Sequence, residues 1–126
     1  MERIRGIERG CIDLIKESAK SVYPREFAGL LSVGDDKSVI SEVVLLPGTV
    51  SGESHAIFSM YMAPIDYSIV GTVHSHPSPY PVPSEADLHL FEKYGRVHII
   101  IASPYDDSSW RAYTFRGEEM ELEVVE

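Results

Sequence analysis

The sequence predicts an α/β or α+β fold in which a single mixed, mainly antiparallel sheet is flanked by helices. Three observations predict this fold. The expected elements follow one another in the order helix, strands, helix, strands. Most successive strands are joined by short turns, which is typical of antiparallel pairing. Segment 97–102 is strongly apolar, as in a central strand that is buried on both faces.

Length and composition are those of one globular domain spanning residues 1–126. The chain is 44% hydrophobic and 25% charged, and it is long enough to bury a core without disulfides or metal staples. No apolar run approaches the ~18 residues of a membrane span. Residues 1–9 lack the apolar region of a secretory signal, and a single cysteine excludes an internal disulfide. We therefore expect a cytoplasmic protein that does not associate with membranes.

The charge of the chain is strongly acidic. A net charge of −9 repels phosphate backbones, so no nucleic-acid partner is expected. Five glutamates lie in the tail from Glu118 to Glu126, where residues 121–124 alternate between acidic and apolar. This alternation predicts an edge strand. The tail strand and the N-terminal helix each offer a surface for homodimer formation.

The N-terminal part of the chain shows helical periodicity. A helix is predicted over about 3–21, ending before Pro24. Its apolar face comprises Ile7, Cys11, Leu14, Ile15 and Val22. Cys11 is expected to be a small buried hydrophobic residue and not a nucleophile, because no neighbouring element suggests an activating histidine.

The next elements are predicted to be strands. Segments 27–33 and 39–46 form a hairpin around the turn at 34–37. A loop is expected at 47–54, a third strand at 55–60, and a turn or short helix at 63–68.

The second half of the chain alternates strands and helix with clear boundaries. Four prolines within 77–83 exclude regular sheet or helix there, because proline lacks the amide donor. The predicted elements are a strand at 69–76, a helix at 84–94, a strand at 97–102, a turn at 104–109, and a final hairpin of 110–115 with 120–125.

Two histidines at the end of the strand 69–76 suggest a metal site. Side chains at i and i+2 of a strand point to the same side, so His74 and His76 share one face while Ser75 faces away. Asp87, in the first turn of the next helix, can supply a third ligand. Two histidines and one aspartate leave a fourth tetrahedral position open, which is the pattern of a catalytic zinc site. Such a site activates water as a nucleophile at neutral pH.

Less specific interpretations of the same residues stay open. Ser84 and Asp87 have the spacing of a capping box, and the two histidines alone fit an exposed strand end. Ser84 also precedes Asp87 by one helical turn, so its hydroxyl can lie beside a metal. A serine triad is disfavoured, because Ser84 is not in a G-x-S-x-G elbow. The proline-rich loop between the two pieces lowers the entropic cost of holding them together.

The run His74-Ser75-His76-Pro77, followed by Ser84 and Asp87, resembles the JAMM motif H-[S/T]-H-P-x(6)-S-x-x-D of the MPN+ zinc metalloproteases. Every motif position is matched, and the element order is similar to that of the MPN fold over nearly the whole chain. The compact length is similar to that of the stand-alone archaeal JAMM proteases. The resemblance implies an MPN (JAMM, cytidine-deaminase-like) fold and one Zn²⁺ per chain.

The resemblance also implies roles for individual residues. His74, His76 and Asp87 would bind the zinc, and Ser84 would donate to the developing oxyanion. Glu26 matches the family's upstream glutamate and would transfer a proton from the attacking water to the leaving amine. From the residues alone, Glu26 cannot be selected among the 20 acidic side chains.

The implied activity is hydrolysis of the isopeptide bond between the C-terminus of a ubiquitin-like small modifier and a target lysine. Two alternatives remain. The chain could process the C-terminus of a ubiquitin-like sulfur-carrier protein, or it could be a non-catalytic binding module stabilised by zinc. Pro47–Ser68 is the candidate for a substrate flap. His55, His89 and His98 match no motif position and are expected to be structural or surface residues.

Overall fold

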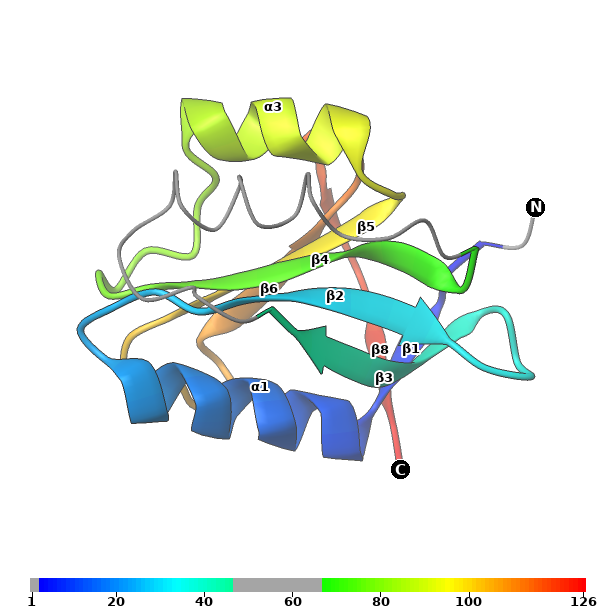
Figure 1. Ribbon diagram of the computed structural model, residues 1–126, viewed down its shortest axis with the longest axis horizontal. Coiled ribbons are helices and arrows are strands. Elements are labelled where there is room, and N and C mark those ends of the chain that lie inside the picture. The colour runs from blue at the N-terminus through cyan, green and yellow to red at the C-terminus, as the bar shows by residue number, and fades with distance from the viewer. Residues whose placement is uncertain (1–2, 47–66) are drawn as a thin grey trace.

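The computed structural model of the chain describes residues 3–46 and 67–126. Within these ranges, eight strands form one sheet in the order β7-β6-β5-β4-β2-β3-β1-β8, with a helix on each side (Figure 1). In chain order the elements are β1 (Gly6–Glu8), α1 (Arg9–Val22), β2 (Ala28–Val33), β3 (Val39–Leu45), β4 (Ile69–His76), α3 (Glu85–Lys93), β5 (Val97–Ala102), β6 (Trp110–Tyr113), β7 (Glu119–Met120) and β8 (Glu123–Val125).

The sheet is mixed, as predicted. Strand β4 lies in the middle, antiparallel to β2 and parallel to β5. The β2–β3, β5–β6 and β6–β7 pairs are antiparallel, and β1 runs parallel to both β3 and β8. Antiparallel pairs are therefore in the majority among the described residues. The predicted hairpin of β2 and β3 is confirmed.

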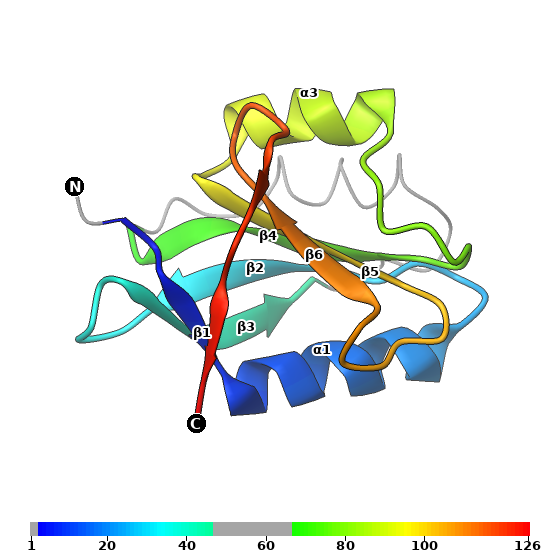
Figure 2. The same cartoon turned by 180° about the vertical axis from the view of Figure 1, so that it is seen from behind.

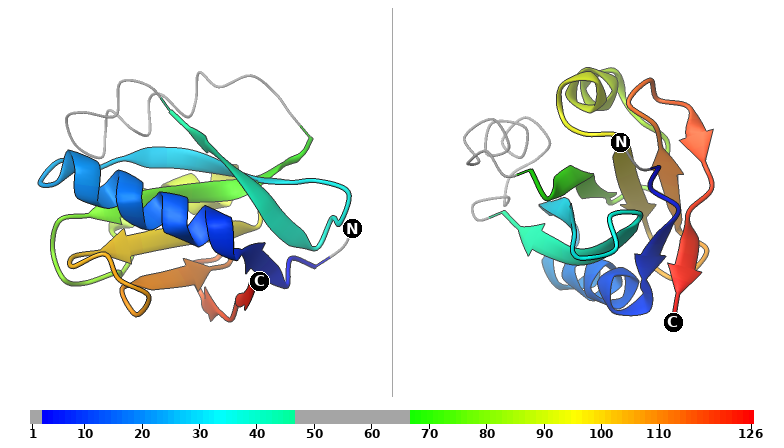
Figure 3. Two further views of the ribbon diagram at one scale, coloured as in Figure 1. Left: turned by 90° about the horizontal axis from the view of Figure 1, so that it is seen from below. Right: turned by 90° about the vertical axis from the view of Figure 1, so that its right-hand side faces the viewer.

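The sheet curls so that its two edges approach each other. Strands β7 and β8 lie at opposite ends of the strand order, yet only residues 121 and 122 separate them in sequence. The end-on view in Figure 3 shows this curl, with the C-terminal strand beside β1. Glu123 and Val124 pair with Gly6 and Ile7, which links the two ends of the chain.

The two helices cover opposite faces of the sheet (Figures 1 and 2). Helix α1 places its buried side chains in the main core, which also contains the inward residues of β2, β4 and β5. Helix α3 covers the other face, where Phe91 packs with Ile100 and Tyr113, and Leu90 packs with Ala28 and Leu30. All six residues of β5 are buried, which confirms the predicted central strand.

Two predicted elements were wrong in part. The helix does not begin at residue 3, because residues 6–8 form β1 and α1 starts at Arg9. Ile4 and Ile7 are buried, and their spacing continues the helical pattern of α1, so periodicity alone could not separate the two elements. The helix end is close to the prediction.

The C-terminal hairpin was also wrong in part. Only β7 pairs with β6, whereas β8 leaves the hairpin and pairs with β1. An alternating pattern predicts a strand but does not identify its partner, which explains the error. The predicted edge position of the tail is confirmed, since β8 ends the strand order.

The predicted loop at 47–54, the strand at 55–60 and most of the segment 63–68 lie outside the described residues. Neither α1 nor α3 is long and apolar enough to cross a membrane, and no other helix is found in the described ranges.

Candidate metal centre

Strand β4 delivers the two histidines to one end of the sheet. His74 pairs with Ala28 of β2 and with Ile100 of β5, so its backbone is held on both sides. His76 is the last residue of the strand. His74 is buried and His76 is partly buried. The central position of β4 therefore fixes both side chains on the same face, as the i, i+2 spacing predicts.

Helix α3 delivers Asp87 through a capping box. The Ser84 hydroxyl accepts from the Asp87 amide at 3.1 Å, and Oδ2 of Asp87 accepts from the Ser84 amide at 2.9 Å. These bonds orient the carboxylate, which is completely buried. The capping interpretation and the metal-site interpretation of this pair are therefore compatible, because the capped carboxylate also faces the histidines.

The three side chains converge on a common point. Nε2 of His74 lies 3.2 Å from Nε2 of His76 and 2.9 Å from Oδ1 of Asp87, and Nε2 of His76 lies 3.2 Å from Oδ2 of Asp87. Two zinc–ligand bonds of about 2.0–2.1 Å at a tetrahedral angle separate their ligand atoms by roughly 3.3–3.4 Å. The spacing of these nitrogen and oxygen atoms thus fits one ion of that size, and the three residues form a potential metal-binding triad.

The His76 imidazole is held in one tautomer. Its Nδ1 lies 3.2 Å from the Tyr80 carbonyl oxygen, which can only accept, so Nδ1 carries a hydrogen, and in the neutral ring Nε2 keeps its lone pair. This arrangement prepares Nε2 for a metal. Burial lowers the pKa of His76, but the hydrogen bond and charge of Asp87, the Tyr80 carbonyl and Glu26 together raise that pKa above its ordinary value.

Glu26 lies beside the triad because Ser75 fastens the start of β2 to β4. The Phe27 amide donates to the Ser75 hydroxyl at 2.9 Å, and the Ser75 amide donates to the Phe27 carbonyl at 3.1 Å. Ser75 faces away from the histidines, as predicted, and its hydroxyl holds the backbone of Phe27. Burial, and less strongly Asp87, raise the pKa of Glu26 despite the opposing effect of His74 and His76.

The environment of Glu26 suits a proton carrier. Its Oε1 is buried and has no hydrogen-bond partner within residues 3–46 and 67–126. A carboxylate with a raised pKa next to a potential metal site is suited to accept a proton and return it. The structure therefore brings together the five residues that the sequence analysis proposed: Glu26, His74, His76, Ser84 and Asp87.

The remaining residues discussed above lie away from the centre or play a structural part. Cys11 is buried, and burial raises its thiol pKa to about 11. His98 is buried beneath the Phe91 ring, with 4.2 Å between ring centroids, and a 2.7 Å hydrogen bond joins it to Thr72. His89 is exposed on α3. His55 lies outside the described residues.

Three contributors to the site were missed by sequence reasoning. They are the Ser75 hydroxyl, the Tyr80 carbonyl and the Tyr105 hydroxyl, which donates to the His76 carbonyl at 3.3 Å. Ser75 was considered only for the direction of its side chain. The contacts of Tyr80 and Tyr105 depend on loop conformations, for which the chain offers no periodic signal.

Comparison with known proteins gives consistent matches over most of the chain. Residues 8–113 match the family described as prokaryotic homologs of the JAB domain. A probable metalloprotease from Haloferax volcanii is 39% identical over 129 residues, which covers 96% of this chain and 80% of the relative.

Two solved structures show the same likeness at the level of fold. A JAB1/MPN domain protein from Archaeoglobus fulgidus is 47% identical with a TM-score of 0.78, covering 96% of this chain and 99% of its own. A second structure, described as a JAMM metalloprotease-like zinc site in the proteasome and signalosome, is 45% identical with a TM-score of 0.76 and covers 98% and 99%.

Proposed function

The chain belongs to the JAMM-type family of prokaryotic homologs of the JAB domain, and from this premise we propose that it is a zinc-dependent isopeptidase. Its substrate would be the bond between the C-terminus of a ubiquitin-like small modifier and a lysine of a target protein. One observation carries the proposal. His74, His76 and Asp87 converge at ligand spacing, with the partly buried Glu26 carboxylate beside them.

Each residue has a part in the proposed reaction. His74, His76 and Asp87 would hold a zinc ion, which would supply Lewis-acid chemistry for activating water and polarising the scissile carbonyl. Glu26 accepts a proton from the attacking water and delivers it to the departing lysine amine as the carbon–nitrogen bond breaks. Ser84 donates its hydroxyl hydrogen to the carbonyl oxygen as negative charge develops there.

The exposed residues of the proline-rich loop 77–83 are an argument for a polypeptide substrate. The backbone carbonyl of Tyr80 holds His76, while Tyr80 as a whole is 68% exposed. Val82, two residues on, is 58% exposed. Both residues belong to the loop that follows His76, and their exposed apolar surface is available to an extended C-terminal tail. Such contacts position the scissile bond against the reacting groups.

The first test combines zinc content with cleavage. Elemental analysis of the purified chain should give one zinc per molecule, and a chelator should abolish cleavage of a modifier conjugate. Mass spectrometry of products from an isopeptide conjugate and from a linear modifier–peptide fusion then distinguishes the proposed reaction from C-terminal processing. Cleavage that survives complete removal of metal would contradict the proposal.

Substitution of Glu26 tests its role in proton transfer. Glu26→Gln should keep the zinc and lower the cleavage rate by at least about 100-fold, in line with the loss of a general base. Glu85→Gln is the matched control, because Glu85 is exposed at the start of α3. It should retain the wild-type rate. An unchanged cleavage rate in Glu26→Gln would contradict the proposed proton transfer, and absence of cleavage by the zinc-loaded wild type would favour a non-catalytic binding module.

A further inference from the structure

The segment between β5 and β6 lies against the end of β4. Its residue Tyr105 is 3% exposed, and the Tyr105 hydroxyl donates to the His76 carbonyl at 3.3 Å. The Tyr105 ring packs edge-on against Tyr23, with 6.0 Å between centroids. Tyr105 therefore contacts the backbone at the residue where β4 ends and the proline-rich loop begins.

The backbone of Tyr105 is strained and held in place. Its φ of 63° lies in the left-handed region, which is unfavourable for a residue with a side chain. The Tyr105 amide donates to the Ala102 carbonyl at 2.9 Å. Oδ1 of Asp106 accepts from Ser108 and Ser109 at 2.8–2.9 Å and closes the turn. Strain of this kind persists only where the surroundings define the conformation.

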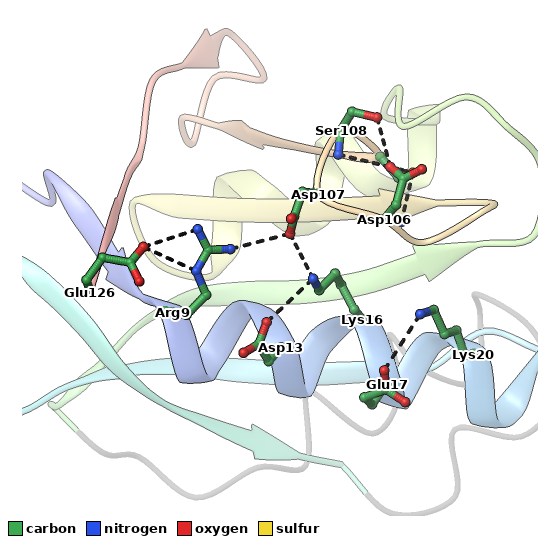
Figure 4. Close-up of polar contacts among 10 residues, drawn as sticks. Arg9, Asp13, Lys16, Glu17, Lys20, Asp106, Asp107, Ser108 and Glu126 are labelled. Carbon is green, nitrogen blue, oxygen red and sulfur yellow. Dashed lines mark hydrogen bonds and ion pairs between the residues drawn. The ribbon is translucent and has the colours of Figure 1, made fainter.

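Ion pairs join helix α1 to the same turn. We call the contacts of Asp107 with Lys16 and Arg9 the clamp. Asp107 accepts from the Lys16 ammonium at 2.8 Å and lies 3.4 Å from the Arg9 guanidinium. Figure 4 shows Lys16 between Asp13 and Asp107, and Arg9 between Asp107 and Glu126. The Lys16 side chain is only 18% exposed, whereas the Asp107 side chain is 67% exposed, so the clamp lies at the surface and is partly screened by solvent.

We propose that Tyr105 is a positioning residue for His76, held by the turn that Asp107 ties to α1. The His76 ring is fixed at Nδ1 by Tyr80, which lies in the following loop. Its backbone carbonyl is fixed by Tyr105. With both anchors present, the direction of Nε2 toward Asp87 is determined. This inference rests on the metal site of the proposed function, and it adds a residue that does not touch the metal.

Tyr105→Phe isolates the hydroxyl, because the ring and its packing remain. Zinc affinity, measured by competition with a chromogenic chelator, should fall about 3- to 10-fold, less than the 10–100-fold typical of a direct partner of a ligand. The absorption spectrum of the cobalt-substituted protein should shift, since ligand geometry changes. The turnover number should fall with an unchanged Michaelis constant. Tyr23→Phe is the matched control and should resemble wild type.

Substitutions in the clamp give a second, independent pair of variants, one that removes a contact and one that serves as its control. Asp107→Asn should weaken zinc binding in the same direction as Tyr105→Phe, whereas Asp13→Asn, which leaves the Lys16–Asp107 contact in place, should not. Wild-type zinc affinity and cobalt spectrum in both Tyr105→Phe and Asp107→Asn would overturn this inference alone. A wild-type chain that binds no zinc would overturn the proposed function as well.

Discussion

At the scale of single residues, His76 shows how the site is defined. Its Nε2 faces His74 and Asp87, its Nδ1 donates to the Tyr80 carbonyl, and its backbone carbonyl accepts from Tyr105. The contact with His74 follows from spacing along the chain, because residues i and i+2 share a strand face. The contact with Asp87 follows from the short loop that joins β4 to α3. The contacts of Tyr80 and Tyr105 come from loops. Spacing therefore predicted the candidate ligands but could not predict the loop residues that hold His76.

Glu26 is the residue for which local pattern was least informative. It lies 48 positions before His74 in the sequence, and no spacing rule connects the two. The family likeness pointed to it, and the Ser75–Phe27 hydrogen bonds show how the chain brings it to the triad. Such proximity arises from the register of β2 against β4, which is a property of the folded sheet.

Cys11 should be almost unreactive in the folded chain. Burial, with smaller effects of Glu8 and Glu42, raises its thiol pKa from 9.0 to about 11, and the thiolate is the reactive form. At pH 8 a shift of that size lowers the thiolate fraction about 100-fold. We expect labelling by a chromogenic disulfide reagent to be at least that much slower in native protein than in denaturant. Labelling at equal rates would contradict the buried position.

At the scale of elements, the boundaries of β4, α3 and β5 were predicted closely. Each has a strong local signal: an apolar run ending at prolines, a capping box, and a continuous apolar segment. Strand β1 was not predicted, and β8 was predicted as an edge strand but with the wrong partner, because the two short strands pair with each other. Local pattern thus predicted the elements that carry the candidate ligands. It did not predict the strand pairing where the two ends of the chain meet.

The parallel contact between β4 and β5 requires a glycine. A Cβ at residue 71 would overlap with the carbonyl group of Val97. Gly71→Ala should therefore lower the free energy of unfolding by more than about 3 kcal/mol, because backbone must move to relieve the overlap. Denaturant titration of the metal-free chain measures this loss.

Gly10 serves as the control for that substitution. It lies in α1, and an added Cβ meets no atom within 4 Å. Gly10→Ala should stabilise the chain by about 0.5–1 kcal/mol through helix propensity. Equal effects of the two substitutions would contradict the close approach of β4 and β5.

At the scale of the whole molecule, the sheet separates two kinds of packing. The main core cluster beside α1 is predominantly aliphatic, whereas the α3 face includes the buried His98 and the candidate metal centre. His98 is stacked on Phe91 and bonded to Thr72, so it belongs to the core and not to the site. A buried neutral histidine makes the stability of the fold depend on pH.

Burial lowers the pKa of His98 from 6.5 to about 3. Between these values the unfolded chain binds a proton that the folded chain does not, so stability is complete above pH 6.5 and falls as the pH drops toward 3. Urea unfolding of the metal-free protein at pH 7.5, 5.5 and 4.5 should show this loss, on the order of a few kcal/mol.

His98→Gln provides the comparison, since its amide can still bond to Thr72. The variant should be less stable than wild type at pH 7.5, but its stability should change less between pH 7.5 and 4.5. Taking the difference between the two proteins cancels the contributions of other titrating groups. Parallel pH profiles would show that His98 does not titrate as its buried position requires.

The sequence by itself determined the mixed sheet, its central strand β5, the hairpin of β2 and β3, and the group of three candidate ligands. These follow from periodicity and spacing within one element or between neighbours joined by a short loop. Only the tertiary structure decided that β8 pairs with β1, that Glu26 lies beside the histidines, and that Tyr105 anchors His76. The physical reason is that contacts between distant segments depend on strand register and on packing of the whole sheet, which no local pattern contains.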